Sequence, residues 1–231
     1  MDNMIKVIHG NIFTTTCQTL VNTVNTQGVM GAGIALEMRM RYPEMFAKYK
    51  ALCKQGLIEV GKLWLYRVSS DRQIINFPTK TSWKLPSRVD YLEKGLHKFI
   101  NTHEEKGIDS IAFPLLGADK GGLDKDFVIR LMKQELERVK IPVEIYVYDA
   151  SAKDDISNTF CERFKSKSEP ELKMLGFTNT AIHKINSLVE RGSIRNMGIL
   201  AAQDGIGLKT IEKCYQLVFG DEQPRNPTFF D

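Results

Sequence analysis

The sequence has few of the features that mark several large classes of protein. Its 231 residues include four cysteines, Cys17, Cys53, Cys161 and Cys214, which lack both the spacing of a zinc site and the density of a disulfide framework. We therefore expect no metal site. No apolar run approaches the roughly 20 residues that span a bilayer, and the N-terminus lacks a basic-then-apolar signal segment. The expected location is the reducing cytoplasm.

A strong excess of charge is also missing. The chain carries 32 Lys and Arg against 28 Asp and Glu, a net charge of +4. Residues 1–150 hold 21 basic and 17 acidic side chains, whereas residues 151–231 hold 11 of each. This balance permits an anionic partner and puts the positive excess in the first part of the chain. The content of 42% hydrophobic and 26% charged residues excludes a disordered chain.

Strand and helix patterns alternate through the first part of the chain. Short apolar runs predict buried strands at residues 5–8, 20–24, 62–68, 74–77, 110–115 and 143–148. Helical spacing recurs over residues 89–100 and 127–139. A further helix is expected from Gly33, with an interruption at Tyr42-Pro43, because proline suits the first turn of a new helix. The alternation predicts an α/β domain over residues 1–150.

The rest of the chain reads differently. Residues 151–171 are polar without a sustained period, which indicates a linker or a frayed connecting helix. Residues 172–220 look helical: Thr178 is a candidate cap, Gly192 a helix end and Ser193 the next start. A third helix should follow Gly205-Ile206-Gly207, and residues 221–231 should form a loosely ordered tail.

Residues 204–210 are similar to a helix-hairpin-helix loop, whose N–H groups can bind DNA phosphate. A plain helix-helix turn is at least as consistent with so short a match, and an element that binds a partner or a second copy is a third alternative.

Two glycine loops follow predicted strands and precede helices, which is where open α/β sheets bind ligands. We call residues 25–35 the first glycine loop and residues 116–123 the second. Glycine lets a backbone approach a ligand closely, and the N–H groups of a helix start favour an anion. Neither loop matches the dinucleotide fingerprint or a P-loop, and ordinary turn chemistry explains each loop alone about as well.

Four motifs follow one another within residues 4–149: Gly10 to Phe13, Val21 to Asn25, Gly31 to Ala35 and Gly117 to Leu123. Together they resemble the macrodomain family of ADP-ribose binders and hydrolases. Val29 to Ala35 and Asn76 to Lys80 are most similar to the DarG-type branch, antitoxins that remove ADP-ribose from DNA. The resemblance implies a three-layer α/β/α fold with a mixed central sheet, followed here by a small helical region.

The resemblance also implies where ADP-ribose lies. Asn11 and Ile12 would lie by the adenine, with Tyr148 stacked on it, although many macrodomains have aspartate at the Asn11 position. Asn25 would hydrogen-bond the distal ribose. The loop residues implied to contact that ribose and the diphosphate are Gly28, Val29, Met30, Gly31, Ala32, Gly33, Ile34, Gly117, Ala118, Asp119, Lys120, Gly121, Gly122 and Leu123.

Lys80 is the catalytic residue that the resemblance implies. A poorly solvated lysine amine can attack the opened sugar as a nucleophile, and a lysine cation can instead polarise or protonate an oxygen; the residues do not choose between these roles. Protein-directed relatives with this lysine carry an aspartate where this chain has Gly121. That departure favours the DNA-directed branch and leaves Asp119 as the candidate acid/base partner.

Trp83 and Lys84 follow Lys80 and are candidates to contact a base and a phosphate of DNA, although Trp83 is equally consistent with a structural role. Basic residues on the first helices, Arg39, Arg41, Lys48, Lys50 and Lys54, form either part of a DNA-binding face or, more simply, a solvated helix surface.

The hypothesis is a glycohydrolase that removes ADP-ribose from DNA bases, without metal or redox cofactor, as antitoxin to a DNA ADP-ribosyltransferase. Its partners would be ADP-ribosylated DNA, single-stranded at the site, and the cognate toxin. Two alternatives stay open: an ADP-ribose-binding module without turnover, and a hydrolase of O-acetyl-ADP-ribose or ADP-ribosylated protein.

Overall fold

The chain divides into two compact units. The computed structural model describes residues 4–220, so the tail expected at residues 221–231 lies outside the described residues. Contacts between Cα atoms separate Met1–Ala150 from Ser151–Asp231, and the division falls where the sequence predicted the α/β domain to end. Each unit is described by itself.

The first unit is built on one mixed sheet. Its strands are β1 (Ile5–Gly10), β2 (Thr19–Asn25), β3 (Trp64–Arg67), β4 (Gln73–Lys80), β5 (Ile111–Pro114) and β6 (Val143–Tyr148). Their order is β1-β6-β5-β2-β4-β3; β3 runs antiparallel to β4 and every other pair is parallel. All six predicted strands are confirmed.

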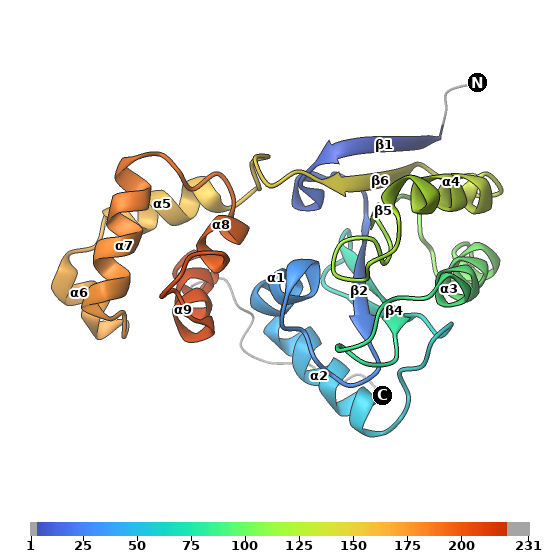
Figure 1. The fold of residues 1–231 in the computed structure, drawn as a ribbon, viewed down its shortest axis with the longest axis horizontal. Helices are drawn as coiled ribbons and strands as arrows, with labels where there is room; N and C mark the ends of the chain where they lie inside the picture. Colours follow the sequence, from blue (N-terminus) through green and yellow to red (C-terminus); the bar gives the residue numbers. More distant parts are fainter. Residues whose placement is uncertain (1–3, 221–231) are drawn as a thin grey trace. The chain divides into compact units, whose positions relative to one another are not determined.

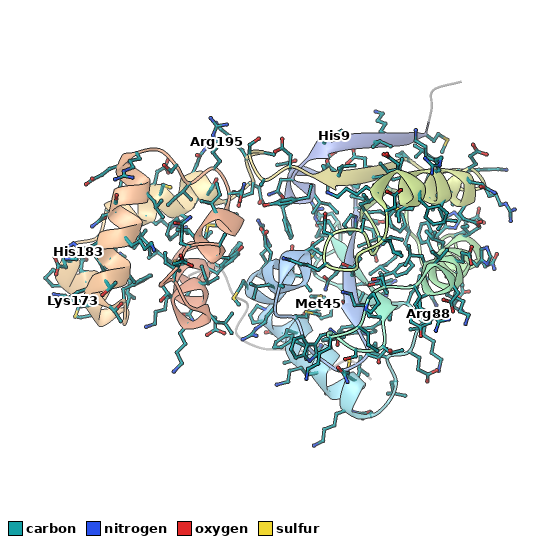
Figure 2. The ribbon with its side chains drawn as sticks, in the orientation of Figure 1. His9, Met45, Arg88, Lys173, His183 and Arg195 are labelled. Carbon is teal, nitrogen blue, oxygen red and sulfur yellow. The ribbon has the colours of Figure 1, made fainter. Side chains whose placement is uncertain are left out.

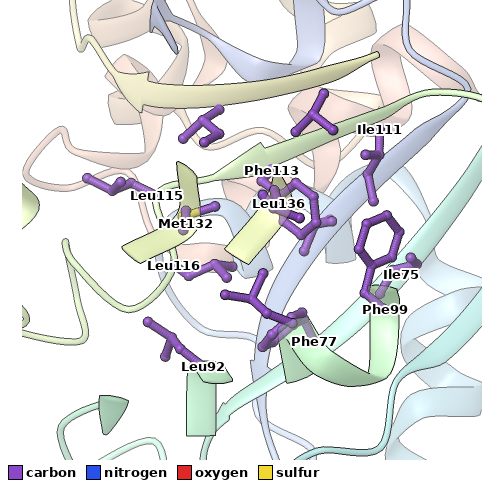
Figure 3. Close-up of a cluster of buried hydrophobic side chains, with 14 of the residues drawn as sticks. Ile75, Phe77, Leu92, Phe99, Ile111, Phe113, Leu115, Leu116, Met132 and Leu136 are labelled. Carbon is purple, nitrogen blue, oxygen red and sulfur yellow. The ribbon is translucent and has the colours of Figure 1, made fainter. Parts of the chain in front are cut away.

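Helices cover both faces of this sheet (Figure 1). They are η1 (Ile12–Thr14), α1 (Gly33–Arg41), α2 (Pro43–Lys54), α3 (Val89–Thr102) and α4 (Lys125–Leu136). One buried cluster joins α3 and α4 to the sheet through side chains that include Leu92, Phe99 and Met132 (Figure 3). A second cluster packs η1, α1 and α2 on the opposite face. The interruption expected at Tyr42-Pro43 is confirmed, with Pro43 as the first residue of α2.

The parallel strands bring distant loops to one edge. Because β1, β2, β4, β5 and β6 run in the same direction, their carboxyl ends meet at one edge of the sheet. The segments that leave this edge are η1, the first glycine loop, the turn after Lys80, the second glycine loop and the chain after Tyr148. This edge is therefore where a site built from several loops can form.

The second unit is helical over its described residues. Its helices are α5 (Ser157–Lys165), α6 (Glu169–Met174), α7 (Asn179–Glu190), α8 (Met197–Ala201) and α9 (Leu208–Phe219). Phe164 is fully buried and makes an edge contact with Phe177, with ring centroids 5.7 Å apart. Lys173 of α6 pairs with Glu169 at 2.6 Å and lowers the pKa of that carboxyl, and His183 of α7 lowers it further; Figure 2 labels Lys173 and His183.

Two expectations for this unit are corrected. Of the two alternatives for residues 151–171, the linker is wrong, because α5 and the start of α6 occupy them. A helix is present, but it is packed and not frayed, since α5 buries Phe160 and Phe164. Ser193 does not start a helix. The next helix, α8, is capped by Asn196, whose side chain accepts a hydrogen bond from the Ile199 N–H. A serine can cap a helix start, but tertiary packing decides which of several polar residues does so.

The remaining helix signals of this unit are confirmed. The Thr178 hydroxyl accepts from the Ala181 N–H at 3.2 Å, and Gly192 adopts φ +62 after α7. Gly205 turns the chain at φ +77, Ile206 is buried, and α9 begins at Leu208. The similarity of residues 204–210 to a DNA-binding hairpin stays a prediction.

Candidate functional site

Asn25 ends β2 and holds the first glycine loop in shape. Its Oδ1 accepts from the N–H of Gln27 at 2.9 Å, and its Nδ2 donates to the carbonyl of Val29 at 2.6 Å. The Tyr49 hydroxyl of α2 donates to the Asn25 main-chain carbonyl at 2.5 Å. Burial raises the pKa of Tyr49, so the phenol stays protonated and remains a donor. Asn25 is thus fixed by its own loop and by α2.

The first glycine loop rests on α2 and leaves its other side open. Gly28 has φ +79, and a Cβ there would lie 3.5 Å from both Lys50 Cα and Cys53 Cβ. Met30 is buried, whereas Gly31 to Gly33 are exposed. Ala32 precedes α1 and provides no side-chain cap, so the first N–H groups of α1 lack a side-chain acceptor. The N-terminus of α1 is therefore suited to receive an anion.

The second glycine loop is a tight turn that faces the first. Leu123 N–H donates to the Gly117 carbonyl at 3.1 Å, and Gly122 N–H donates to the Ala118 carbonyl at 3.2 Å. A Cβ on Gly33 would lie 4.0 Å from Lys120 Cγ, so the Lys120 side chain reaches the start of α1. The two loops that the sequence predicted to clasp one ligand are brought together.

Lys80 lies between these loops. It is the last residue of β4 and pairs with Asn25 of β2, next to an irregularity in the register after Val24. Its Nζ donates to the main-chain carbonyl of Lys120 at 2.5 Å. Burial lowers the pKa of the Lys80 amine, because a partly desolvated ammonium is less stable than a solvated one. Lys80 thus combines a position beside Asn25 with an amine that gives up its proton more readily than a solvated lysine does.

No carboxylate is bonded to Lys80 in the part of the chain that the structure describes. Asp119, the candidate partner, is half-exposed and forms an ion pair with Lys125 at 3.1 Å. Gly121 has no room for a side chain: a Cβ there would lie 2.1 Å from the Gly117 carbonyl oxygen. An aspartate at this position would require the loop backbone to move.

The residues predicted to hold the adenine also come together. Gly10 of β1 pairs with Tyr148 of β6, which places Asn11 beside the end of β6. Asn11 is buried and caps η1, its Oδ1 accepting from the Phe13 N–H at 3.0 Å. Ile12 is buried and Tyr148 is half-exposed. Tyr148 is therefore the most exposed of these three residues.

The turn after Lys80 carries the two residues predicted to contact DNA. Trp83 is 55% exposed, and the Lys84 amine lies 5.3 Å from the centre of its ring. The Thr26 hydroxyl donates to the Thr81 carbonyl at 2.8 Å, which ties this turn to the first glycine loop. Trp83 and Lys84 thus border the loop that holds Asn25.

One of the basic residues of α1 and α2 cannot belong to an exposed basic face. Arg41 is buried, stacks on the Phe13 ring at 3.9 Å and pairs with Glu37 at 2.8 Å, so its guanidinium has a structural role. Lys50 is exposed and lies under Gly28.

Sequence reasoning missed a pair of buried amides behind the site. Asn22 Nδ2 donates to Asn76 Oδ1 at 2.9 Å, and Asn76 Nδ2 lies 3.6 Å from the sulfur of Met45, which Figure 2 labels beside α2. Both asparagines have no exposed surface. Their presence inside runs predicted as buried strands was the available signal, since a buried amide needs a partner.

Other kinds of site are not apparent in residues 4–220. No group of three His, Cys, Asp or Glu side chains is arranged to hold a metal ion. No helix within this range has the length and hydropathy to cross a membrane.

The fold and the loops around Lys80 define a class of protein. A family model described as the Macro domain matches residues 21–132, the stretch from β2 to α4. The solved macrodomain of Mycobacterium tuberculosis DarG is 39% identical, with a TM-score of 0.59, and the match covers 62% of this chain and 96% of that one. The chain therefore belongs to the macrodomain family.

The similar proteins indicate which branch of the macrodomain family this chain resembles. A DNA ADP-ribosyl glycohydrolase of Thermus aquaticus is 38% identical over 149 residues, which cover 63% of this chain and 41% of that protein. Thermosipho africanus DarTG, solved in complex with ADP-ribose, is 33% identical with a TM-score of 0.61; the match covers 67% of this chain and 44% of that one. The macrodomain is thus of the DarG type, and the chain spans about two fifths of the length of the curated relatives it matches.

Proposed function

We propose that this protein is a glycohydrolase that removes ADP-ribose from ADP-ribosylated DNA bases. The observation that carries the proposal is the position of the Lys80 amine, beside Asn25 and bonded to the second glycine loop. The names of the similar proteins support the same substrate: the relatives from Thermus aquaticus and Mycobacterium tuberculosis are DNA ADP-ribosyl glycohydrolases.

ADP-ribose would be bound across the edge of the sheet. Asn11, Ile12 and the exposed ring of Tyr148 would hold the adenine, and the N–H groups of the two glycine loops and of α1 would hold the diphosphate. The distal ribose would then lie over Asn25. The positive excess of residues 1–150 supports this arrangement, because the ligand carries two negative charges at its diphosphate.

Lys80 would act at the anomeric carbon of that ribose. As a neutral amine it would attack C1 of the ring-opened sugar. The bond from C1 to the base nitrogen would break, a proton from the amine would pass to that nitrogen, and water would hydrolyse the resulting imine. As a cation it would polarise the ring oxygen or the leaving group. The lowered pKa of Lys80 supports the first role. Asp119 would serve as proton donor only after its ion pair with Lys125 opens.

The DNA strand would leave the site over the turn after β4. The exposed indole of Trp83 offers a face on which a base can stack, and the neighbouring Lys84 amine offers a phosphate contact. This geometry suits a single strand, because a base must be unpaired to stack on a side chain.

We also infer a role as antitoxin to a DNA ADP-ribosyltransferase, which would make the protein a repair factor for modified DNA. A fusion protein of Thermosipho africanus combines a DNA ADP-ribosyl transferase with the glycohydrolase in one chain, which supports this pairing. The substrate and the unpaired cysteines favour a cytoplasmic location.

The test compares the wild-type chain, Lys80→Ala and the control Lys62→Ala on an ADP-ribosylated oligonucleotide and an ADP-ribosylated protein. We expect Lys80→Ala to lower the rate of release from DNA by at least about 100-fold while the Kd for ADP-ribose changes little. Lys62→Ala should retain activity, because this exposed lysine pairs with Glu59 and lies outside both glycine loops. Tight binding without release from either substrate would contradict the proposal in favour of a binding module, and release from protein alone would favour the protein-directed alternative.

A further inference from the structure

The second glycine loop encloses a serine that the proposed function does not use. Ser87 lies between β4 and α3 and is 4% exposed. Its main-chain N–H donates to the Gly121 carbonyl at 2.9 Å. A Cβ on Gly117 would lie 2.8 Å from Ser87 Cβ, and a Cβ on Gly121 would lie 2.4 Å from Ser87 Oγ. The loop can pass this close to Ser87 because both positions are glycine.

The hydroxyl of Ser87 has no partner. In residues 4–220, Ser87 Oγ is one of three buried side-chain polar atoms without a hydrogen bond; Asn22 Oδ1 and His103 Nε2 are the others. Leaving a buried hydroxyl unpaired costs free energy, which a hydrogen bond to the loop would recover. Of the three atoms, only Ser87 Oγ is directed at a ligand-binding loop.

An acceptor for this hydroxyl lies close by. The point where a Gly121 Cβ would stand is 2.4 Å from Ser87 Oγ and 2.1 Å from the Gly117 carbonyl oxygen, so the two oxygens border the same small space. The Gly117 carbonyl accepts from the Leu123 N–H at 3.1 Å, which occupies one of its two lone pairs. A diphosphate that takes this N–H would leave the carbonyl able to turn toward Ser87 Oγ.

We propose that Ser87 is a positioning residue for the diphosphate. Its hydroxyl, which is buried without a hydrogen bond among residues 4–220, donates to the Gly117 carbonyl when a diphosphate takes the Leu123 N–H. The hydrogen bond gained at Ser87 then contributes to ligand affinity. This inference rests on the proposed function only in that the second glycine loop receives a diphosphate.

The test uses the full chain with Ser87→Ala, which removes the hydroxyl and keeps the Cβ. We expect the Kd for ADP-ribose and for ADP to rise about tenfold, the factor that one hydrogen bond supplies, while the Kd for adenosine is unchanged. The Tm of the ligand-free protein should stay the same or rise, because an unpaired buried group has been removed. The control is Ser110→Ala, whose hydroxyl accepts from the Gln18 N–H at 2.8 Å; it should lower the Tm and leave every Kd unchanged.

Two results would overturn the proposal. One is a Ser87→Ala protein that binds ADP-ribose as tightly as wild type. The other is a lower Tm with equal losses for ADP-ribose and adenosine, which is the signature of a purely structural serine. Wild type that binds ADP-ribose but releases none from DNA would contradict the proposed function alone, and wild type that does not bind ADP-ribose would overturn both.

Discussion

At the scale of the residue, Lys80 shows how position changes the chemistry of a common side chain. An exposed lysine is a solvated cation, but Lys80 closes β4 and is partly buried, which lowers its pKa. Its neighbour Asn25 is fixed by Tyr49 and by its own loop, so the reacting sugar would meet two groups of defined geometry.

The pH dependence of the reaction should report the state of Lys80. If the neutral amine is the nucleophile, the rate of release rises as Lys80 loses its proton and levels off above its pKa. Because burial lowers that pKa, the midpoint should fall below the value of an ordinary lysine, about 10.4. Single-turnover release from an ADP-ribosylated oligonucleotide across pH 6 to 10 measures this.

A rate that falls with rising pH would indicate the other role of Lys80. If Lys80 acts as a cation, the rate falls as pH rises through the same pKa. A rate independent of pH over the whole range would argue against both roles, and the Lys80→Ala protein provides the baseline.

At the scale of the element, the site depends on how closely α3 packs on the sheet. Gly95 of α3 lies directly over the Phe77 ring of β4, where a Cβ would stand 2.1 Å from Phe77 Cζ. Phe77 lies three residues before Lys80 on the same strand. The contact between Gly95 and Phe77 therefore helps to set how closely β4 lies to α3, and with it the position of the Lys80 amine.

We expect Gly95→Ala to lower the free energy of unfolding by about 1–3 kcal/mol, because overpacking outweighs the gain of about 1 kcal/mol in helix propensity. Chemical denaturation measures this loss. Gly31→Ala is the matched control, since its Cβ would meet only Val29 Cγ1 at 3.8 Å. Equal stability of both variants would show that α3 can move away from β4 at little cost.

At the scale of the whole molecule, the macrodomain contains its own core and its own site. Both large hydrophobic clusters of the sheet are built from residues between Ile5 and Tyr146. Every residue proposed to bind or cleave ADP-ribose also lies within Met1–Ala150. The match to the solved Mycobacterium tuberculosis DarG macrodomain covers 96% of that chain. A macrodomain of similar length has therefore been solved without a second unit like residues 151–231 in the matched part.

A fragment of residues 1–150 should therefore unfold cooperatively and bind ADP-ribose within about twofold of the full chain, since burial sufficient for stability lies within it. Thermal unfolding and calorimetric titration measure the two properties. A fragment that folds but loses release from DNA would show that residues 151–231 take part in substrate recognition.

The strands and several helix starts could be predicted from the sequence, because they depend on the pattern of residues over a short stretch. The apolar runs predicted all six strands, and Pro43 and Thr178 marked helix starts by their backbone and capping chemistry. The prediction that a helix starts at Ser193 is wrong. Several polar residues in this stretch can cap a helix, and in the packed structure Asn196 does so. The linker predicted at residues 151–171 is wrong, because the two phenylalanines that α5 buries are too few to produce a recognisable helical period.

The sequence alone predicts the strands, the two glycine loops and a lysine three residues after a predicted strand, because apolar runs and the backbone freedom of glycine act over short stretches. Only the tertiary structure decided that the Lys80 amine meets the Lys120 carbonyl, that Asp119 pairs with Lys125 and that Ser87 lies unpaired between Gly117 and Gly121. These contacts join residues from separate strands and loops. Their geometry follows from the parallel order of the sheet, which no local pattern contains.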